Sequence, residues 1–302
     1  MTRRWHRVTI VGCGLIGASF ALALRNANAC ELIAGWDSEQ SELDEAVRTG
    51  VIDEVDQAFA SAGPAGAISS SDLIYLSMPV GEIIDFLRER GGQIKAGAVI
   101  TDAGSTKVEI CRAAQSHLAN HHRFVGGHPI AGSHLHGLAH ARGDLFSGAP
   151  YVLIADEVRG PQPALTALRE TIEEMGASVT CMSAADHDRA MALVSHLPQI
   201  VSSALAAATR NQPDAENLVN ISGAGYRDMT RLASSPWSMW HDILATNSKE
   251  TAAALDELIA RLASVRDDLR AYSGRGIDLN KTRQLFDENR AAIKPSRSQE
   301  GN

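Results

Sequence analysis

The chain has 302 residues, which is long enough for two domains that each bury a hydrophobic core. Hydrophobic residues make up 44% of the chain and charged residues 21%, the composition of an ordinary globular protein rather than of a disordered or fibrous one. The formal net charge of -8 at pH 7 argues against nucleic acid or an anionic membrane as a partner. Any basic site for an acidic substrate must therefore be local.

The cysteines are scattered without the paired spacing of a disulfide framework or a zinc site, so we expect reduced thiols in a cytoplasmic protein. A basic N-terminal segment followed by an apolar run has the outline of a signal peptide, but glycines in fingerprint register favour a strand and a helix instead. We find neither a membrane-spanning segment nor an internal repeat, and we expect no membrane partner. The cysteines are Cys13, Cys30, Cys111 and Cys181.

The first predicted element is an apolar strand over residues 8–11, which passes into Gly-x-Gly-x-x-Gly and then into a small-residue helix over 18–24. In this context the glycines form a dinucleotide-binding fingerprint: Gly12 permits the tight turn, Gly14 lets the backbone approach a pyrophosphate, and Gly17 lets the helix lie close to the strand. The helix N-terminus also offers free N–H groups to phosphates. The residues that we expect to bind the cofactor here are Gly12, Gly14, Leu15, Ile16 and Gly17.

Asp37 follows a second apolar run, residues 32–36, about 20 residues after the glycines. A carboxylate at this position can accept hydrogen bonds from both hydroxyls of an adenine ribose. The next three residues, 38–40, include no arginine or lysine to receive a 2′-phosphate. The sequence therefore predicts NAD rather than NADP as the cofactor. The alternative, a tight glycine turn with no ligand, does not call for an acid at this distance.

Strands and helices continue to alternate after Asp37. The predicted elements are a helix over 39–48, a strand over 72–77, a helix over 82–90, a strand over 98–102, and a turn over 103–107 that opens a further helix. This alternation predicts a doubly wound parallel sheet of the Rossmann type. Because the carboxyl ends of parallel strands line the ligand crevice, Ser77, Met78 and Pro79 should border the cofactor.

A histidine between glycines ends the next predicted strand, in the run over 124–133. A hydroxyl whose carbon loses a hydride must also lose its proton, and His128 is placed to accept that proton. A histidine that only caps a turn remains an equal alternative from the spacing alone.

The pattern changes near Met182 and Ser183. Strands over 151–154 and 177–181 around a helix over 163–175 precede this point, and after it we expect helices over 186–209, 215–221, 238–272 and 280–293. The sequence thus predicts an NAD-binding domain over 1–182 and an all-helical domain over 183–302. The apolar stretch over 190–208 is too rich in alanine and leucine to face water on all sides, so we expect it to be buried between helices of one or two subunits.

Polar groups that packing does not require occur at two places in the helical half. His196 stands just before a helix-kinking proline, Pro198, and a glycine-rich turn over 222–226 precedes Asp228 and Arg231. An arginine so placed can bind a carboxylate with two parallel hydrogen bonds while the aspartate orients it. A solvated helix start remains the alternative interpretation of this second stretch.

Histidines are also dense between residues 117 and 140. His136, His140 and Asp144 would share one face if their segment were helical, which is a conceivable metal site. No matching carboxylate or cysteine cluster occurs elsewhere in the sequence, and dehydrogenation with NAD needs no metal. We therefore favour solvent-facing histidines and expect no metal.

Taken together, these motifs resemble the prephenate/arogenate dehydrogenase family of tyrosine biosynthesis from residue 8 to about residue 272. The resemblance implies an NAD-dependent oxidative decarboxylation of prephenate to 4-hydroxyphenylpyruvate, or of arogenate to tyrosine, by a Rossmann-type domain joined to a helical dimerisation domain. A homodimer is expected. The motifs that carry the resemblance are those over 12–17, 101–107, 127–132, 195–198 and 225–231, with Met239 and Trp240 downstream.

The resemblance also implies roles for individual residues. His128 would hydrogen-bond the ring hydroxyl and help to take its proton, and Ser105 would sit between His128, that hydroxyl and the cofactor. Arg231 would bind a substrate carboxylate, and His196 would be the second histidine of the pocket. The other residues assigned to substrate binding are Asp228 and Gly225 in the glycine-rich segment, Trp240, which could come from the partner subunit, and His134.

This sequence departs from the family pattern at two positions. Many members carry an acid where His134 follows Ser133, and many carry a further histidine where Gln199 stands. A carboxylate at the first position would favour the ammonium group of arogenate, whereas a histidine need not, so both substrates stay open.

Two other functions compete. A β-hydroxyacid dehydrogenase or imine reductase would need a helical lysine as its acid or base, and Lys249 is a weak candidate because no glycine-rich motif precedes it. A non-catalytic NAD-binding sensor would not need His128, Ser105 and Arg231 together.

Overall fold

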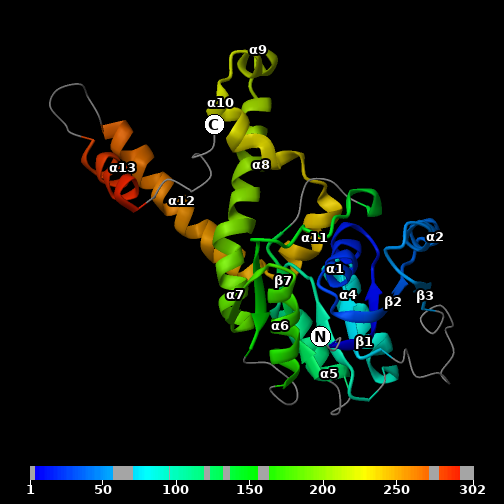
Figure 1. The fold of residues 1–302 in the computed structure, drawn as a ribbon. Helices are drawn as coiled ribbons and strands as arrows, with labels where there is room; N and C mark the ends of the chain where they lie inside the picture. The colour runs from blue at the N-terminus through cyan, green and yellow to red at the C-terminus, as the bar shows by residue number, and fades with distance from the viewer. Residues whose placement is uncertain are drawn as a thin grey trace. The chain divides into compact units, whose positions relative to one another are not determined.

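The structure is a computed structural model that describes residues 4–56, 71–94, 96–118, 123–131, 137–155, 163–271 and 279–292 (Figure 1). Its contacts divide the chain into two compact units, Met1–Ser248 and Lys249–Asn302. His134, His136 and Tyr272, which the sequence analysis included in its predictions, lie outside the described residues.

Six parallel strands form the main sheet of the first unit. They are β1 (Trp5–Val11), β2 (Cys30–Trp36), β3 (Glu54–Val55), β4 (Leu73–Leu76), β5 (Val99–Asp102) and β6 (Arg123–Val125). Their order in space is β3-β2-β1-β4-β5-β6, with every neighbouring pair parallel. The strand order reverses between β1 and β4, which is where open α/β sheets place their ligands. The predicted doubly wound parallel sheet is therefore confirmed.

Helices cover both faces of this sheet and give the unit two hydrophobic cores. Phe20 of α1 (Leu15–Asn26) and Leu168 of α6 (Pro163–Glu174) belong to one core. Leu87 of α4 (Val80–Arg90) and Ile110 of α5 (Val108–His117) belong to the other. The helix α2 (Gln40–Arg48) buries only Leu43 and Ala46.

A second, smaller sheet follows, and here one prediction is wrong. The strand predicted to run from residue 124 to His128 is divided: β6 ends at Val125, and β7 (Gly127–Pro129) begins a separate sheet with β8 (Pro150–Ile154) and β9 (Ser178–Met182). The strands β7 and β8 are antiparallel. A Cβ on Gly127 would lie 2.6 Å from the carbonyl oxygen of Asp102, so this crossing close to β5 requires a residue without a side chain. The change of sheet places His128 beside the carboxyl end of β5.

The helical region begins at Ala184, two residues after the last strand. Its elements in the first unit are α7 (Ala184–Met191), the π-helical turn η3 (Ala192–His196), α8 (Leu197–Arg210), α9 (Ala215–Asn220), α10 (Ala224–Thr230) and α11 (Trp237–Thr246). The remaining helices are α12 (Ser248–Ala271) and α13 (Asn280–Ala292). Short 3₁₀-helices span Gly91–Gln93, Leu138–His140 and Arg231–Ser234.

The single helix predicted over 238–272 is wrong. The chain breaks between α11 and α12 at Asn247, which is non-helical with φ -125° and ψ 32°. Its side-chain amide donates a hydrogen bond to the carbonyl oxygen of Asp188 at 2.7 Å. Asparagine readily exchanges helical bonds for such contacts, so the break fixes the end of α11 against α7.

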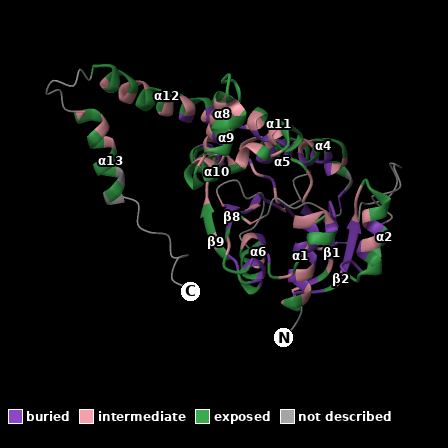
Figure 2. Cartoon of the chain, turned by 90° about the horizontal axis from the view of Figure 1, so that it is seen from above, coloured by how far each residue is buried: buried purple, intermediate pink, exposed green. Residues whose placement is uncertain are grey.

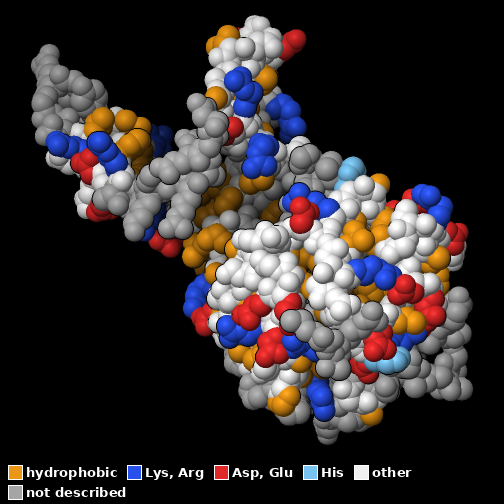
Figure 3. Space-filling model, viewed as in Figure 1, with side chains coloured by type: hydrophobic (Ala, Val, Ile, Leu, Met, Phe, Trp, Pro, Cys, Tyr) orange, Lys and Arg blue, Asp and Glu red, His pale blue; other side chains and the backbone are white. Residues whose placement is uncertain are grey.

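One helical segment among the described residues, Ala184–Arg210, is long and apolar enough to cross a membrane by length and composition. Only 28% of its most apolar window is buried, and α8 is largely intermediate or exposed in Figure 2. Hydrophobic side chains also lie on the surface at the end that carries α9 (Figure 3), where Ile221 is 80% exposed. Core helices and helices covered by another subunit have the same composition, so the sequence property alone does not identify a membrane span.

Candidate functional site

The fingerprint glycines have the local geometry that their predicted tasks require. Gly12 has φ +93°, and a Cβ there would lie 2.8 Å from the carbonyl oxygen of Ser77. A Cβ on Gly17 would overlap the carbonyl oxygen of Gly12, which keeps α1 close to β1. A Cβ on Gly14, by contrast, would meet no atom within 4 Å. Gly14 therefore presents bare backbone at the N-terminus of α1, which is the surface that a pyrophosphate needs.

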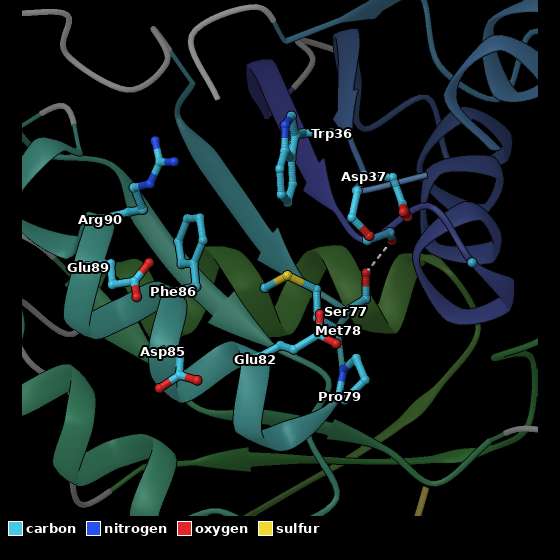
Figure 4. A pocket seen from close by; sticks show the side chains of 13 residues that line it. Trp36, Asp37, Ser77, Met78, Pro79, Glu82, Asp85, Phe86, Glu89 and Arg90 are labelled. Carbon is cyan, nitrogen blue, oxygen red and sulfur yellow. Dashed lines mark hydrogen bonds between the residues drawn. The ribbon is translucent and has the colours of Figure 1, made fainter. Parts of the chain in front are cut away.

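A first pocket of about 430 Å³ opens beside this turn (Figure 4). Asp37 lines it and is rigidly held: one carboxylate oxygen accepts a hydrogen bond from the Cys13 backbone N–H at 2.6 Å, and the other accepts one from the Glu39 N–H at 3.0 Å. Both oxygens have further acceptor capacity for ribose hydroxyls. The remaining lining residues are Gly12, Gly14, Trp36, Ser38, Ser77, Met78, Pro79, Glu82, Asp85, Phe86, Glu89 and Arg90.

The charge in this pocket is mostly negative. Glu82, Asp85 and Glu89 line it together with Asp37, and Arg90 is the only described cation in its lining. Burial and the nearby Asp37 raise the pKa of Glu82. These acids would repel a 2′-phosphate, which agrees with the preference for NAD that the sequence indicates.

Two aromatic residues of the first pocket were missed by the sequence analysis. Trp36 ends β2, directly before Asp37, and Phe86 lies on α4. Figure 4 shows both rings pointing into the pocket from these two elements. Flat rings offer an apolar face to a purine. The signal available in the sequence was the tryptophan next to the expected ribose-binding acid.

A second pocket of about 580 Å³ continues from the first and shares Gly14, Ser77, Met78 and Pro79 with it. It contains Ser105 and His128 from the sheet region. Ser238, Met239 and Ile243 of α11 close it from the helical side. The two pockets thus form one crevice along the carboxyl ends of β1, β4 and β5, and Leu15 and Ile16 line it as well.

The turn that carries Ser105 is pinned by a buried ion pair. Lys107, fully buried, binds the carboxylate of Asp102 and also donates to the carbonyl oxygen of Gly127 at 2.6 Å. Asp102 in turn accepts hydrogen bonds from the backbone N–H groups of Gly104 at 2.8 Å and Gly127 at 3.1 Å. These bonds fix the 102–107 turn and the strand of His128 to each other.

His128 is backed by a second histidine from α7. Its Nδ1 lies 2.8 Å from Nε2 of His187, whose own Nδ1 lies 2.7 Å from a carboxylate oxygen of Asp188. Desolvation, followed by the nearby His187 and Lys107, holds the pKa of His128 well below its usual range. His128 is therefore neutral near pH 7, the form in which an imidazole can accept a proton.

His196 lies behind the crevice rather than in its lining. It ends the π-helical turn η3, in which the N–H of Leu197 bonds to the carbonyl oxygen of Ala192. Pro198 accounts for this wider turn, since it has no N–H and its ring would clash with the carbonyl four residues earlier. The His196 ring lies 3.2 Å (Nδ1) from the Asn247 amide nitrogen, and burial lowers its pKa to about 4.

Trp240 packs edge-on against the His196 ring, with 5.9 Å between ring centroids. Its buried indole N–H has no acceptor among the residues that the structure describes. An unmatched donor of this kind is available to a ligand. Its neighbours Ser238 and Met239 line the second pocket, although Trp240 itself does not.

Three of the predicted substrate-binding residues are not brought to the crevice within one chain. Arg231 lies in the 3₁₀-helix after α10, Asp228 and Gly225 lie on α10, and all three are exposed and line neither pocket. Gln199 anchors this region by donating to the carbonyl oxygen of Leu232 at 2.8 Å.

The sequence analysis named two alternative sites, a metal site with His136 and His140 and a lysine site with Lys249. No group of three histidine, cysteine or acidic side chains among the described residues is arranged to hold a metal ion. His140 belongs to the short 3₁₀-helix Leu138–His140, and the arrangement of His136 lies outside the described part. Lys249 lies on α12, in the second unit.

Comparison with protein families gives two consecutive matches. Residues 20–181 match the family described as "Prephenate dehydrogenase, nucleotide-binding domain", and residues 183–282 match "Prephenate dehydrogenase, dimerization domain". The change from one to the other falls at residue 182, whereas the compact units of the structure divide at residue 248.

Individual relatives agree with these matches. The chain is 33% identical over 268 residues to a prephenate dehydrogenase of Bacillus subtilis, covering 88% of this chain and 71% of that protein. It is 29% identical over 272 residues to a cyclohexadienyl dehydrogenase of Zymomonas mobilis, covering 89% and 90%.

Solved structures with similar folds belong to the same group. The structure of an Aquifex aeolicus prephenate dehydrogenase, in complex with hydroxyphenyl propionate and NAD+, has a TM-score of 0.84 at 28% identity, covering 96% of this chain and 98% of that one. A Synechocystis arogenate dehydrogenase has a TM-score of 0.78 at 28% identity, covering 95% and 99%.

Proposed function

This chain belongs to the prephenate dehydrogenase family, and we propose that it converts prephenate to 4-hydroxyphenylpyruvate with NAD as cofactor and loss of CO2. The observation that carries the proposal is the placement of His128. Its imidazole is partly buried, backed by a hydrogen-bonded histidine, and lines the same continuous crevice as the fingerprint glycines and Asp37.

The residues along the crevice fit NAD. The bare backbone of Gly14 would hold the pyrophosphate, Asp37 would hold the ribose, and Trp36 and Phe86 would offer flat surfaces to the adenine. The other residues that we propose to bind NAD are Gly12, Leu15, Ile16, Ser77, Met78 and Pro79, with Gly17 acting through helix packing. When bound, NAD supplies the hydride acceptor.

The chain's own residues supply the rest of the chemistry. His128 accepts the proton of the ring hydroxyl as the ring carbon that carries this hydroxyl loses its hydride. Ser105 hydrogen-bonds the same hydroxyl. The ring carboxylate then leaves as CO2 and the ring becomes aromatic. No covalent bond to the enzyme is required, so catalysis rests on positioning, proton removal and placement of charge. His196 orients Trp240 at the edge of this pocket.

We further propose that the active form is a homodimer in the cytoplasm. Only 28% of the most apolar window of Ala184–Arg210 is buried within one chain, and this segment lies in the region that matches a dimerization domain. Arg231 and Asp228 line neither pocket of their own chain, so we assign them to the carboxylate end of the partner's crevice, with Gly225 shaping the turn that carries them. The four free cysteines are consistent with a reducing compartment.

We propose that the boundary near residue 182 separates two domains with different functions. Residues 1–182 bind NAD and carry His128 and Ser105, and residues 183–302 complete the substrate pocket and the dimer. His134 lies outside the described residues, and we propose that it contributes to the choice of substrate.

Arogenate is the second candidate substrate, because the chain is also similar to an arogenate dehydrogenase and a cyclohexadienyl dehydrogenase. The test offers prephenate and arogenate separately, each with NAD and with NADP, and follows the absorbance of the reduced nicotinamide. We expect turnover of prephenate with NAD. If only arogenate is turned over, arogenate rather than prephenate is the substrate. If none of the four assays shows activity while the protein still binds NAD, a non-catalytic NAD-binding sensor is favoured.

A further inference from the structure

Asp188 is a buried carboxylate that the proposed reaction has not used. It is 1% exposed, and one of its oxygens accepts the Lys107 N–H at 2.7 Å while the other accepts the Val108 N–H at 2.9 Å. These N–H groups belong to the start of α5, where a helix has donors without intrahelical partners and a positive dipole end. Asp188 thus joins α7 to the turn that carries Ser105.

The Asp188 carboxylate can accept a further hydrogen bond, and His187 is placed to donate it. The carboxylate oxygen that accepts from Lys107 also lies 2.7 Å from Nδ1 of the His187 ring, which is fully buried. A carboxylate can only accept hydrogen bonds, so Nδ1 of His187 carries the hydrogen. Burial lowers the pKa of His187, which favours a neutral ring whose Nε2 has a free lone pair.

The position of the hydrogen on His187 determines which ring nitrogen of His128 carries a hydrogen. Nε2 of His187 can act only as an acceptor, and it lies 2.8 Å from Nδ1 of His128. Nδ1 of His128 must therefore donate, which leaves its Nε2 without a hydrogen. Since His128 lines the second pocket, Nε2 is the nitrogen available as a base to a substrate hydroxyl.

We propose that His187, oriented by Asp188, is a positioning residue that fixes the tautomer of His128 in which Nε2 can accept the substrate proton. This inference rests on the proposed function for its consequence, but the tautomer itself does not depend on any substrate. The proton moves from the ring hydroxyl to Nε2 of His128, whose positive charge is then shared through the His187 contact toward Asp188.

The other charged and titratable groups around His128 do not supply this orientation. Lys107, from the turn before α5, is bound to Asp102 of β5 and to the Gly127 carbonyl. His196, from η3, is paired with Asn247. Both act on His128 through the electrostatic field, whereas His187 makes the hydrogen bond.

The test compares three variants of the full-length protein. His187→Gln retains an acceptor close to the position of the histidine Nε2, whereas His187→Phe fills the space without one. Asp188→Asn can keep an oxygen toward both the Lys107 N–H and Nδ1 of His187, with its amide nitrogen near the Val108 N–H. It should therefore retain both tautomers and remove only the negative charge. Nitrogen-15 NMR of the His128 ring in the NAD complex reports which nitrogen carries the hydrogen, and steady-state kinetics reports kcat and KM.

For the unaltered protein, His187→Gln and Asp188→Asn we expect the hydrogen on Nδ1 of His128. For His187→Phe we expect loss of this preference and a kcat lower by about 10²-fold or more, the scale of general-base catalysis. NAD affinity should change little. The pH at which kcat falls on the acid side should change in His187→Phe and stay the same in His187→Gln.

Two results would overturn the inference: a hydrogen on Nε2 of His128 in the unaltered protein, or an undiminished kcat in His187→Phe. If His187→Phe fails to fold, as judged by NAD binding and the melting temperature, the His128 tautomer in the unaltered protein, His187→Gln and Asp188→Asn decides. Failure of the proposed function has a different signature, in which the unaltered protein shows the expected tautomer but turns over neither prephenate nor arogenate.

Discussion

The proposed reaction depends first on His128. Replacement by asparagine keeps a polar side chain but removes the base, so His128→Asn should lower kcat by about 10²–10⁴-fold with little change in NAD affinity. Initial rates and NAD titration of the variant check this. A kcat equal to that of the unaltered protein would exclude His128 as the proton acceptor.

The pH profile gives a further expectation for the same residue. A base must be neutral, and the pKa of His128 lies well below its usual range. Activity should therefore persist below the ordinary histidine pKa of about 6.5 and fall only as the pH drops through the depressed value.

The fingerprint glycines separate binding from packing. Gly17→Ala should destabilise the fold by about 1–3 kcal/mol, because its Cβ would overlap the backbone of Gly12. Gly14→Ala serves as the matched control: it has open space, so the melting temperature should hold while NAD binding weakens. Equal loss of stability in both variants would contradict these separate roles.

Much of this residue-level description follows from the sequence, and the exceptions have a common cause. The glycines, Asp37 and His128 lie in local motifs whose spacing is set by one turn. His187 contacts His128, and Asp188 holds His187, because α7 packs on the start of α5, a contact across some 80 residues. A contact between residues so far apart leaves no signal in the local sequence. Residues 186–188 have the composition of an ordinary helix start.

Among the helices and turns, the π-helical turn η3 is the element that positions His196. Pro198→Ala restores an N–H that can bond to the Val194 carbonyl, so the helix should become regular and His196 should leave Asn247 and Trp240. We expect a lower kcat with an unchanged or higher melting temperature. Pro213→Ala, in the exposed turn before α9, is the control and should leave both unchanged.

A lower melting temperature with full activity in Pro198→Ala would show that the turn serves stability alone. The proline and its kink were visible in the sequence, but the direction of His196 was not. The main sheet could likewise be predicted from the sequence, because strands and helices alternate along it. The separate sheet of β7–β9 and the break at Asn247 could not, because they arise from tertiary contacts.

In the assembled dimer, Arg231 is assigned to the substrate carboxylate in the partner's crevice. Arg231→Ala should raise the KM for prephenate far more than the KM for NAD, because a bidentate carboxylate contact is lost. Arg210→Ala, an exposed arginine at the end of α8, is the matched control.

Mixed dimers decide the origin of this arginine. Co-expression of His128→Asn and Arg231→Ala chains should restore part of the activity if Arg231 serves the partner's crevice, since one intact site forms per mixed dimer. Absence of recovery in purified mixed dimers would place Arg231 in its own chain's site.

The proposed function requires that one crevice couple oxidation of prephenate to loss of its ring carboxylate. The most direct measurement is the amount of CO2 released from prephenate for each NADH formed. The account predicts equal amounts, with both falling in the same proportion in His128→Asn. NADH without CO2, or no NADH from prephenate by a protein that binds NAD, would contradict it.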